Sequence, residues 1–123
     1  KHIYRKSSLD KMYALLKENN MLILASDQDA KKRGAFVNFF DQPSSTPKGS
    51  AIFHMQSGAP MVFSVAHKEK DGTVVISFSK IELNGSASIE TITQTYTTML
   101  EEKVREYPDH YFWFHRKWKT RTE

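Results

Sequence analysis

The sequence MLILASDQDAKKRGAFVNFF, residues 21–40, decides the fold that we predict, because it joins a short apolar run to a polar cluster. The apolar part, residues 21–25, has the length and composition of a buried strand. In open α/β sheets, ligands bind in the crevice beyond the carboxyl ends of the strands. Asp27, Gln28 and Asp29 directly follow the run and are therefore candidates for a binding site. The alternative is a solvent-exposed turn, because Asp and Gln also cap loops.

The composition limits the class of protein. The chain has 123 residues, which fits a single domain over residues 1–123. A hydrophobic fraction of 39% and a charged fraction of 26% are typical of globular domains, and no stretch approaches the roughly 18 apolar residues of a membrane-spanning helix. The absence of cysteine excludes disulfides and thiolate chemistry. A net charge of +4 and a pI near 9.3 favour an anionic partner: a phosphate, a lipid headgroup or a nucleic acid. Because the sequence begins at Lys1 and shows no leader, we expect a piece of a longer protein.

Capping signals predict two of the helices. Ser7 and Asp10 flank the start of an apolar helical face, which predicts a helix over residues 8–18 that ends at Asn19 and Asn20. Thr46 and Pro47 form a second start signal, and Gly58 is a matching stop, so we expect a helix over residues 47–57. The preceding residues 42–47 resemble a linker.

The remaining elements complete an α/β fold with a mixed sheet and flanking helices. Residues 61–66 predict a strand, and the intervening helix favours a right-handed parallel crossover from residues 21–25. Asp71-Gly72 predicts an antiparallel hairpin between this strand and residues 73–79. Apolar residues at helical spacing predict a long helix from Ser88 to Pro108, packed on the sheet.

The segment that follows, residues 109–121, combines aromatic and basic side chains. We expect the rings of Tyr111, Phe112 and Trp113 to be largely buried. We expect the basic residues to fringe a cleft or a membrane surface; they are Arg116, Lys117, Lys119 and Arg121. Two alternatives stay open at this point: rings docked on the core with solvated charges, and stacking on single-stranded nucleic acid.

Several motifs together resemble the carboxyl-terminal part of the lipid A biosynthesis lauroyl/myristoyl acyltransferase family. The resemblance spans almost the whole chain, and its most specific part is the aromatic block that leads into HRKWKTR. The motifs are DQD at residues 27–29, GAFVNFF at 34–40, TPKGSA at 46–51, GAPMV at 58–62 and PDHYFWFHRKWKTR at 108–121.

The resemblance implies part of a glycerolipid-acyltransferase-like fold, here the carboxyl-terminal portion of an acyltransferase domain. It implies an enzyme at the cytoplasmic face of the inner membrane of Gram-negative bacteria, held there peripherally or by an anchor outside this sequence. That enzyme would move a fatty acyl chain from acyl carrier protein to a lipid A precursor. Neither a cofactor nor a metal is implied, and no nucleic-acid partner is expected.

The catalytic motif of the family, His-x4-Asp/Glu, is missing from this sequence. In that motif a histidine acts as general base on the acceptor hydroxyl and a carboxylate orients it. Five residues beyond the histidines at positions 2, 54, 67, 110 and 115 stand Ser7, Ala59, Gly72, His115 and Thr120, none of which is acidic. We therefore expect no catalytic residue in this chain, and expect the motif and a membrane anchor upstream of Lys1.

The resemblance also implies substrate-binding residues. Asp27, Gln28 and Asp29 match the acidic motif of the family, and Arg116 and Lys117 lie in its closing run. Arg33 is our candidate for contact with a phosphate or sugar acid, because a guanidinium binds anionic oxygens in a planar fork; Lys31 and Lys32 could share or replace that role. Phe36, Phe39 and Phe40 are expected to pack the core or to wall an acyl groove, and His54 to be an ordinary helix residue.

Two other functions compete with this interpretation. The first is a non-catalytic module that binds anionic lipid or nucleic acid, which the pI, the aromatic and basic segment and the missing motif support. The second is a glycerolipid acyltransferase of the wider superfamily. Steep salt dependence without a lipid requirement would indicate nucleic-acid binding, whereas the family resemblance predicts preference for lipid A precursors.

Overall fold

The computed structural model of the chain describes residues 9–83, 85 and 87–121. Three helices, four strands and two short 3-10 turns alternate along this part of the chain. In order, they are α1 (Leu9–Lys17), η1 (Lys31–Arg33), β1 (Ala35–Phe39), β2 (Gln42–Thr46), α2 (Gly49–Ser57), β3 (Val62–Lys68), β4 (Val74–Lys80), α3 (Ile89–Glu106) and η2 (Pro108–His110).

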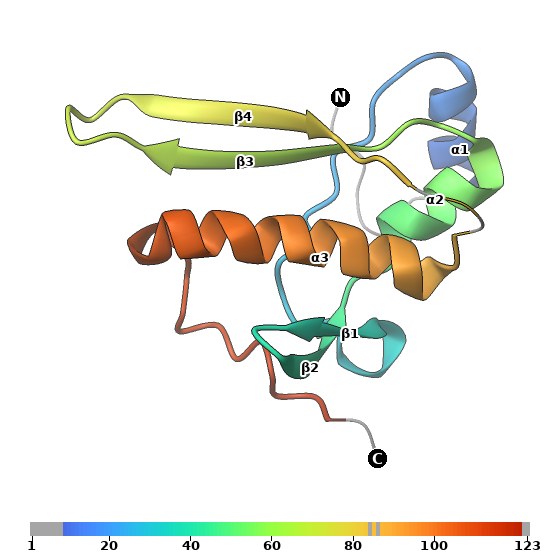
Figure 1. Cartoon of the computed structure of the whole chain (residues 1–123). Helices are drawn as coiled ribbons and strands as arrows, with labels where there is room; N and C mark the ends of the chain where they lie inside the picture. The colour runs from blue at the N-terminus through green and yellow to red at the C-terminus, as the bar shows by residue number, and fades with distance from the viewer. Residues whose placement is uncertain (1–8, 84, 86, 122–123) are drawn as a thin grey trace.

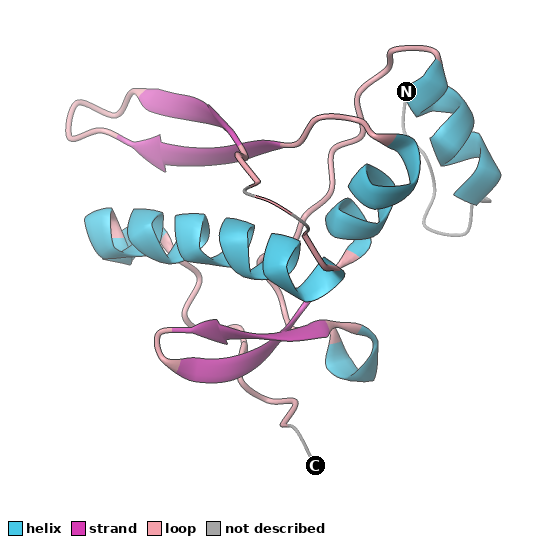
Figure 2. Ribbon diagram, turned by 45° about the vertical axis from the view of Figure 1, so that its right-hand side comes forward, coloured by secondary structure: helices cyan, strands magenta, loops and turns pink. Residues whose placement is uncertain are grey.

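The long helix α3 lies between two hairpins. Figure 1 shows the β3–β4 hairpin on one side of α3 and the β1–β2 hairpin on the other. Figure 2, turned by 45°, shows the same three layers, with α2 against the first turns of α3 and α1 outside α2. The α/β class predicted from the sequence is confirmed, because helices and small sheets pack together throughout the described residues.

The signals for α3 are confirmed. The hydroxyl of Ser88 accepts a hydrogen bond from the backbone N–H of Thr91 at 3.1 Å, which caps the helix start. The buried face of the helix includes Ile92 and Tyr96, which pack with Ala51 of α2 and with Ile81 in the main hydrophobic core. Pro108 follows the last turn and begins η2, so the helix ends where the sequence predicted.

The second predicted helix begins later than its start signal indicated. Thr46 is the last residue of β2, and α2 begins at Gly49, so the Thr-Pro pair precedes the helix and does not cap it. Its end is as expected: Gly58 has φ 70°, in the left-handed region, and its N–H donates to the carbonyl of His54 at 2.8 Å. The helix α1 is confirmed as well and is followed by Asn19 at φ 58°, whereas its predicted cap at residues 7–8 lies outside the described residues.

The β3–β4 hairpin is confirmed, with Gly72 at φ 93° in its loop. The parallel crossover from residues 21–25 is wrong. Those residues have no regular secondary structure, and Ile23 is 85% exposed. The physical reason is that a short apolar run becomes a strand only when a neighbouring strand pairs with its backbone. In the described part of the chain both sheets are two-stranded and antiparallel, and no strand pairs with residues 21–25.

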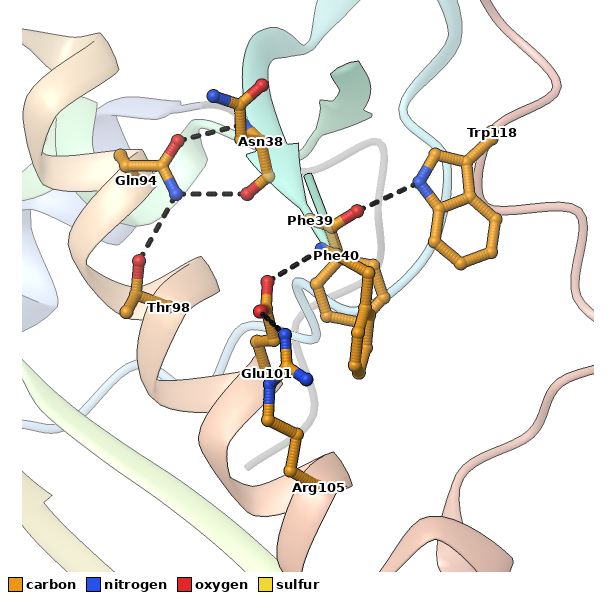
Figure 3. A network of polar contacts seen from close by, with 8 residues as sticks. All are labelled: Asn38, Phe39, Phe40, Gln94, Thr98, Glu101, Arg105 and Trp118. Atoms are coloured by element: carbon orange, nitrogen blue, oxygen red, sulfur yellow. Dashed lines mark hydrogen bonds and ion pairs between the residues drawn. The ribbon is translucent and has the colours of Figure 1, made fainter. Parts of the chain in front are cut away.

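The β1–β2 hairpin was not predicted, and its second strand occupies the residues interpreted as a linker. Its two-residue turn holds Phe40 at φ 52° and Asp41 at φ 57°, where Asn and Gly are usual. Contacts with α3 stabilise this turn, as Figure 3 shows: the N–H of Phe40 donates to Glu101 at 2.6 Å. The guanidinium of Arg105 lies 4.7 Å from the centre of the Phe40 ring. Tertiary contacts thus replace the local turn signal.

The free edge of β1 is closed by a side chain. The Gln94 amide donates to the carbonyl of Asn38 at 2.9 Å and accepts from the Asn38 N–H at 2.8 Å (Figure 3). These are the two hydrogen bonds that a neighbouring strand would make, so Gln94 substitutes for that strand. Phe39, at the end of β1, is fully buried, which confirms its place in the core, whereas Phe36 and Phe40 are only partly buried.

The expected roles of the aromatic and basic residues near the end of the chain are partly reversed. Phe112 is 65% exposed and Trp113 is 47% exposed, although we expected both rings to be largely buried; Tyr111 is half-buried. Lys117, expected at the fringe, has no exposed surface. The reason is that the core space beside Phe39 is filled by the Trp118 ring, at 5.6 Å between centroids, and by the stem of Lys117.

Candidate functional site

The candidate site consists of residues 27–29, which we call the acidic loop, and residues 111–121, which we call the tail. The acidic loop is irregular chain between the exposed residues 21–25 and η1. The tail is a series of tight turns after η2. Although the two segments are far apart in sequence, a set of hydrogen bonds joins them.

Asp29 takes part in two of these hydrogen bonds, one through its backbone N–H and one through its carboxylate. Its N–H donates to Nε2 of His115 at 2.8 Å, and its Oδ2 accepts from the hydroxyl of Thr120 at 2.9 Å. Because a backbone N–H can only donate, Nε2 of His115 is the acceptor in this hydrogen bond. Oδ1 of Asp29 is buried and has no partner among the described residues. The tail thus fixes Asp29 while leaving one of its acceptors unused.

The buried side chain of Lys117 hydrogen-bonds to the backbone of the acidic loop. Its ammonium donates to the hydroxyl of Thr46 at 3.0 Å and to the carbonyl of Gln28 at 3.4 Å, and it lies 5.8 Å from the centre of the Phe39 ring. Burial lowers the pKa of Lys117 to about 8, although the nearby charges of the two acidic-loop carboxylates act in the opposite direction. The structure therefore gives Lys117 a positioning role, and its direct contact with a substrate stays a prediction.

Tyr111 contacts the acidic loop from the other end of the tail. Its hydroxyl donates to the carbonyl of Asp27 at 3.5 Å. Burial, reinforced by the charge of Asp27, raises the pKa of Tyr111 to about 12. The phenol therefore stays protonated at neutral pH and remains a hydrogen-bond donor.

Exposed polar and charged side chains occur in the acidic loop, in η1 and in the tail. The side chains of Asp27 and Gln28 are exposed and make no hydrogen bond within the described residues. Arg33, in η1, and Arg116, in the tail, are exposed too, and neither forms an ion pair in the described part of the chain. The structure thus brings the predicted acidic and tail residues into one cluster, whereas nothing described here places Arg33 against the acidic loop.

Two of the described histidines contact groups within the fold. Nδ1 of His54 donates to the carbonyl of Ala59 at 2.8 Å, so the ring contacts the backbone just beyond its own helix. His67 contacts Glu69 at 2.9 Å and stacks on Tyr107 at 4.0 Å between ring centroids, and its side chain is buried. The described residues also contain no group of three or more His, Cys, Asp or Glu side chains placed to bind a metal.

A groove of about 660 Å³ runs between β1 and α3. Phe36 and Met99 contribute apolar surface, but Thr91, Thr95 and Glu102 line it too. The hydroxyls of Thr91 and Thr95 already hydrogen-bond to neighbouring groups at the start of α3, so the groove has a mixed apolar and polar lining. Among the described residues no helix is both long enough and apolar enough to cross a membrane.

Sequence reasoning missed His115 and Thr120 as members of the site and missed the burial of Lys117. The signal that could have found them is their spacing, because His115, Lys117 and Trp118 are interleaved with exposed cations. Trp118 also contributes, since its indole N–H donates to the carbonyl of Phe39 at 3.1 Å. This alternation of inward and outward side chains predicts burial only weakly, because the tail has no regular secondary structure.

An acidic loop with exposed carboxylate and amide groups, held by hydrogen bonds from the tail, forms a polar candidate site on an α/β scaffold. The model of the family described as bacterial lipid A biosynthesis acyltransferase matches residues 1–120. The chain belongs to this family, and the resemblance predicted from the sequence is confirmed.

Two relatives support the assignment. The sequence is 27% identical over 119 residues to the lipid A biosynthesis palmitoleoyltransferase of Escherichia coli (strain K12), covering 94% of this chain and 39% of that protein. The lipid A biosynthesis acyltransferase of Shigella flexneri is similar with the same identity and coverage. The chain thus spans 39% of the length of these relatives.

Proposed function

We propose that this chain is part of an enzyme that transfers a fatty acyl chain from acyl carrier protein to a lipid A precursor. Family membership and the names of the two relatives support the reaction class and the acceptor. Acyl carrier protein as donor is the finer part of the proposal and rests on the resemblance alone. We place the enzyme at the cytoplasmic face of the bacterial inner membrane, where such a lipid acceptor would be embedded.

The observation that carries the proposal is the unused binding capacity of the acidic loop. The tail holds this loop through the backbone of all three of its residues and through one oxygen of Asp29. The carboxylate of Asp27 and the amide of Gln28 are exposed and make no hydrogen bond in the described chain, whereas the unpartnered Oδ1 of Asp29 is buried. Ordered acceptors of this kind suit the hydroxyl groups of a sugar.

The cations complement these acceptors. We assign Arg33 and Arg116 to the phosphate groups of the precursor, because guanidinium groups bind anionic oxygens with two parallel hydrogen bonds. No catalytic residue is assigned to this chain, since none of its histidines has an acidic residue five positions on. In this proposal the chain binds and orients the acceptor, and the general base lies elsewhere in the enzyme.

Binding of a detergent-solubilised lipid A precursor to the chain tests the proposal directly. Asp27→Asn and Arg33→Ala should each weaken this binding. The control is Lys80→Ala on the β3–β4 hairpin, which removes one positive charge, as Arg33→Ala does, and should leave the affinity unchanged. Equal affinity in wild type and both site variants would refute the assignment. Tighter, salt-sensitive binding to single-stranded nucleic acid would favour the competing binding module instead.

Kinetics of acyl transfer by the gene product that carries this sequence give a second test. If Arg33 contributes uniform binding, Arg33→Ala should raise the KM for the lipid acceptor more than it lowers kcat. The opposite pattern would indicate that Arg33 acts in the transition state. Asp27→Ala should lower transfer by more than about twofold.

A further inference from the structure

We propose that the turn formed by residues 112–115, which we call the phenyl turn, inserts its two phenylalanine rings into the interface of an anionic bilayer. This inference deepens the proposed function, on which it rests for its biological setting. It concerns Phe112 and Phe114, which are 65% and 90% exposed. Exposed large apolar side chains placed side by side mark interaction surfaces more often than chance.

The geometry of the phenyl turn separates these two rings from the rest of the aromatic block. The rings of Phe112 and Phe114 contact each other with centroids 5.9 Å apart. Trp113, between them in sequence, packs instead against Tyr111 at 4.9 Å and Phe40 at 5.9 Å, and its indole N–H donates to the carbonyl of Pro108 at 2.6 Å. One residue of the block therefore belongs to the fold, while its two neighbours project away from it.

The phenyl turn is held at both ends. The carbonyl of Phe112 accepts from the N–H of His115 at 3.1 Å, which closes the turn. His115 in turn accepts from Asp29, and Tyr111, just before the turn, donates to Asp27. Because its base is fixed, the turn would present its two rings to a membrane without a further cost of ordering the backbone.

Charges beside the phenyl turn determine which partner it suits. From residue 110 to residue 121 the sequence contains no acidic residue. Arg116, Lys119 and Arg121 are exposed and form no ion pair in the described part of the chain. Each cation close to an anionic membrane surface contributes roughly 1 kcal/mol, which is about fivefold in binding. The combination of projecting rings and flanking cations therefore matches an anionic lipid surface.

A bilayer also fits the shape of this surface better than a protein does. Two projecting rings need a matching pocket on a protein, whereas the interfacial region of a bilayer accommodates a projecting apolar group of any shape. A protein partner is accordingly the outcome that the experiment must be able to detect.

Vesicle co-sedimentation tests the inference, with vesicles of phosphatidylcholine alone and of phosphatidylcholine mixed with phosphatidylglycerol. The wild-type chain should bind the anionic vesicles and bind the neutral ones weakly. Phe112→Ser combined with Phe114→Ser should lower the partition coefficient by about tenfold or more, because burial of even one phenyl ring changes partitioning by roughly that factor. Arg116→Gln with Lys119→Gln should weaken binding to the anionic vesicles and reduce its salt dependence.

Phe78→Ser is the matched control, because Phe78 on β4 is 68% exposed but lies away from the tail. It should leave vesicle binding unchanged. All variants should melt like wild type, since the replaced rings are exposed; if the double variant does not fold, the single variant Phe114→Ser answers the same question. Vesicle binding that is unaffected by the phenylalanine changes, or lost equally with Phe78→Ser, would overturn the proposal.

Two further outcomes separate this proposal from its alternatives. If the double variant loses affinity for acyl carrier protein but keeps its affinity for vesicles, the phenyl turn binds a protein and the membrane proposal is wrong. The vesicles contain neither acceptor nor donor, and acceptor binding is measured in detergent, so each result can fail without the other. Loss of precursor binding in Asp27→Asn would therefore support the proposed function even if vesicle binding fails.

Discussion

The pH dependence of folding stability tests the buried ammonium of Lys117. A lysine in the unfolded chain keeps its proton up to a pKa of 10.5, whereas burial lowers the pKa of folded Lys117 to about 8. Between these two values the unfolded chain binds more protons than the folded chain. The free energy of unfolding should therefore rise with pH in this interval, by up to about 3 kcal/mol at 1.36 kcal/mol per pH unit.

The variant Lys117→Met removes the titrating group but keeps a flexible, largely apolar side chain. Its free energy of unfolding should lack the rise, so the difference between wild type and variant should grow toward high pH. The measurement is urea denaturation followed by tryptophan fluorescence at a series of pH values from about 7.5 to 10. Above pH 10 the raised pKa of Tyr111 acts in the opposite direction, because the folded phenol then holds its proton longer than the unfolded one.

Lys119→Met is the matched control for this prediction. Lys119 lies two residues along the tail but is exposed, so its removal should leave the wild-type pH profile unchanged. Equal slopes for wild type and Lys117→Met would refute the reasoning. A wild-type free energy of unfolding that falls between pH 8 and pH 10 would refute it too, because the ammonium would then be stabilised in the folded chain.

Three stability predictions follow from packing and are checked by thermal or urea denaturation. Gly34→Ala should destabilise the fold by about 1 to 3 kcal/mol, because a methyl group there would collide with the Ser45 hydroxyl and with backbone. Gln94→Leu should cost about 1 to 3 kcal/mol, since it leaves an N–H and a carbonyl of the β1 edge without these partners, and an unchanged stability would show that water replaces them. Trp118→Ala should destabilise more than Trp113→Ala, because only Trp118 stacks on the buried ring of β1; the reverse order would contradict the packing described here.

The elements that could be predicted from the sequence are those with local signals. The Ser88 cap, the Gly58 stop and the Asp71-Gly72 turn each depend on residues that are close together in the chain. The β1–β2 hairpin could not be predicted, because its turn residues, Phe40 and Asp41, adopt a conformation that neither prefers. Contacts with α3 impose that conformation, and such contacts have no local signature.

The candidate site was predicted in its parts but not in its arrangement. The acidic loop and the tail were identified separately, and the structure joins them through pairs such as Asp29 and His115, which are 86 residues apart. The burial of Lys117 could not be predicted, because lysine is rarely buried and nothing in its neighbourhood marks it as an exception. The exposure of residues 21–25 was missed for the opposite reason, since an apolar run does not reveal whether a strand pairs with it.

The long separation between the two halves of the site affects the order in which the protein folds. The contacts of the tail with the acidic loop span 84 to 91 residues of chain. Contacts of such length are slow to form, because a large loop must close first. Residues 115–120 are synthesised after all the helices and hairpins described above, so those elements can assemble before the tail reaches the acidic loop. The hydrogen bonds that hold the acidic loop therefore form late, because they wait for the tail.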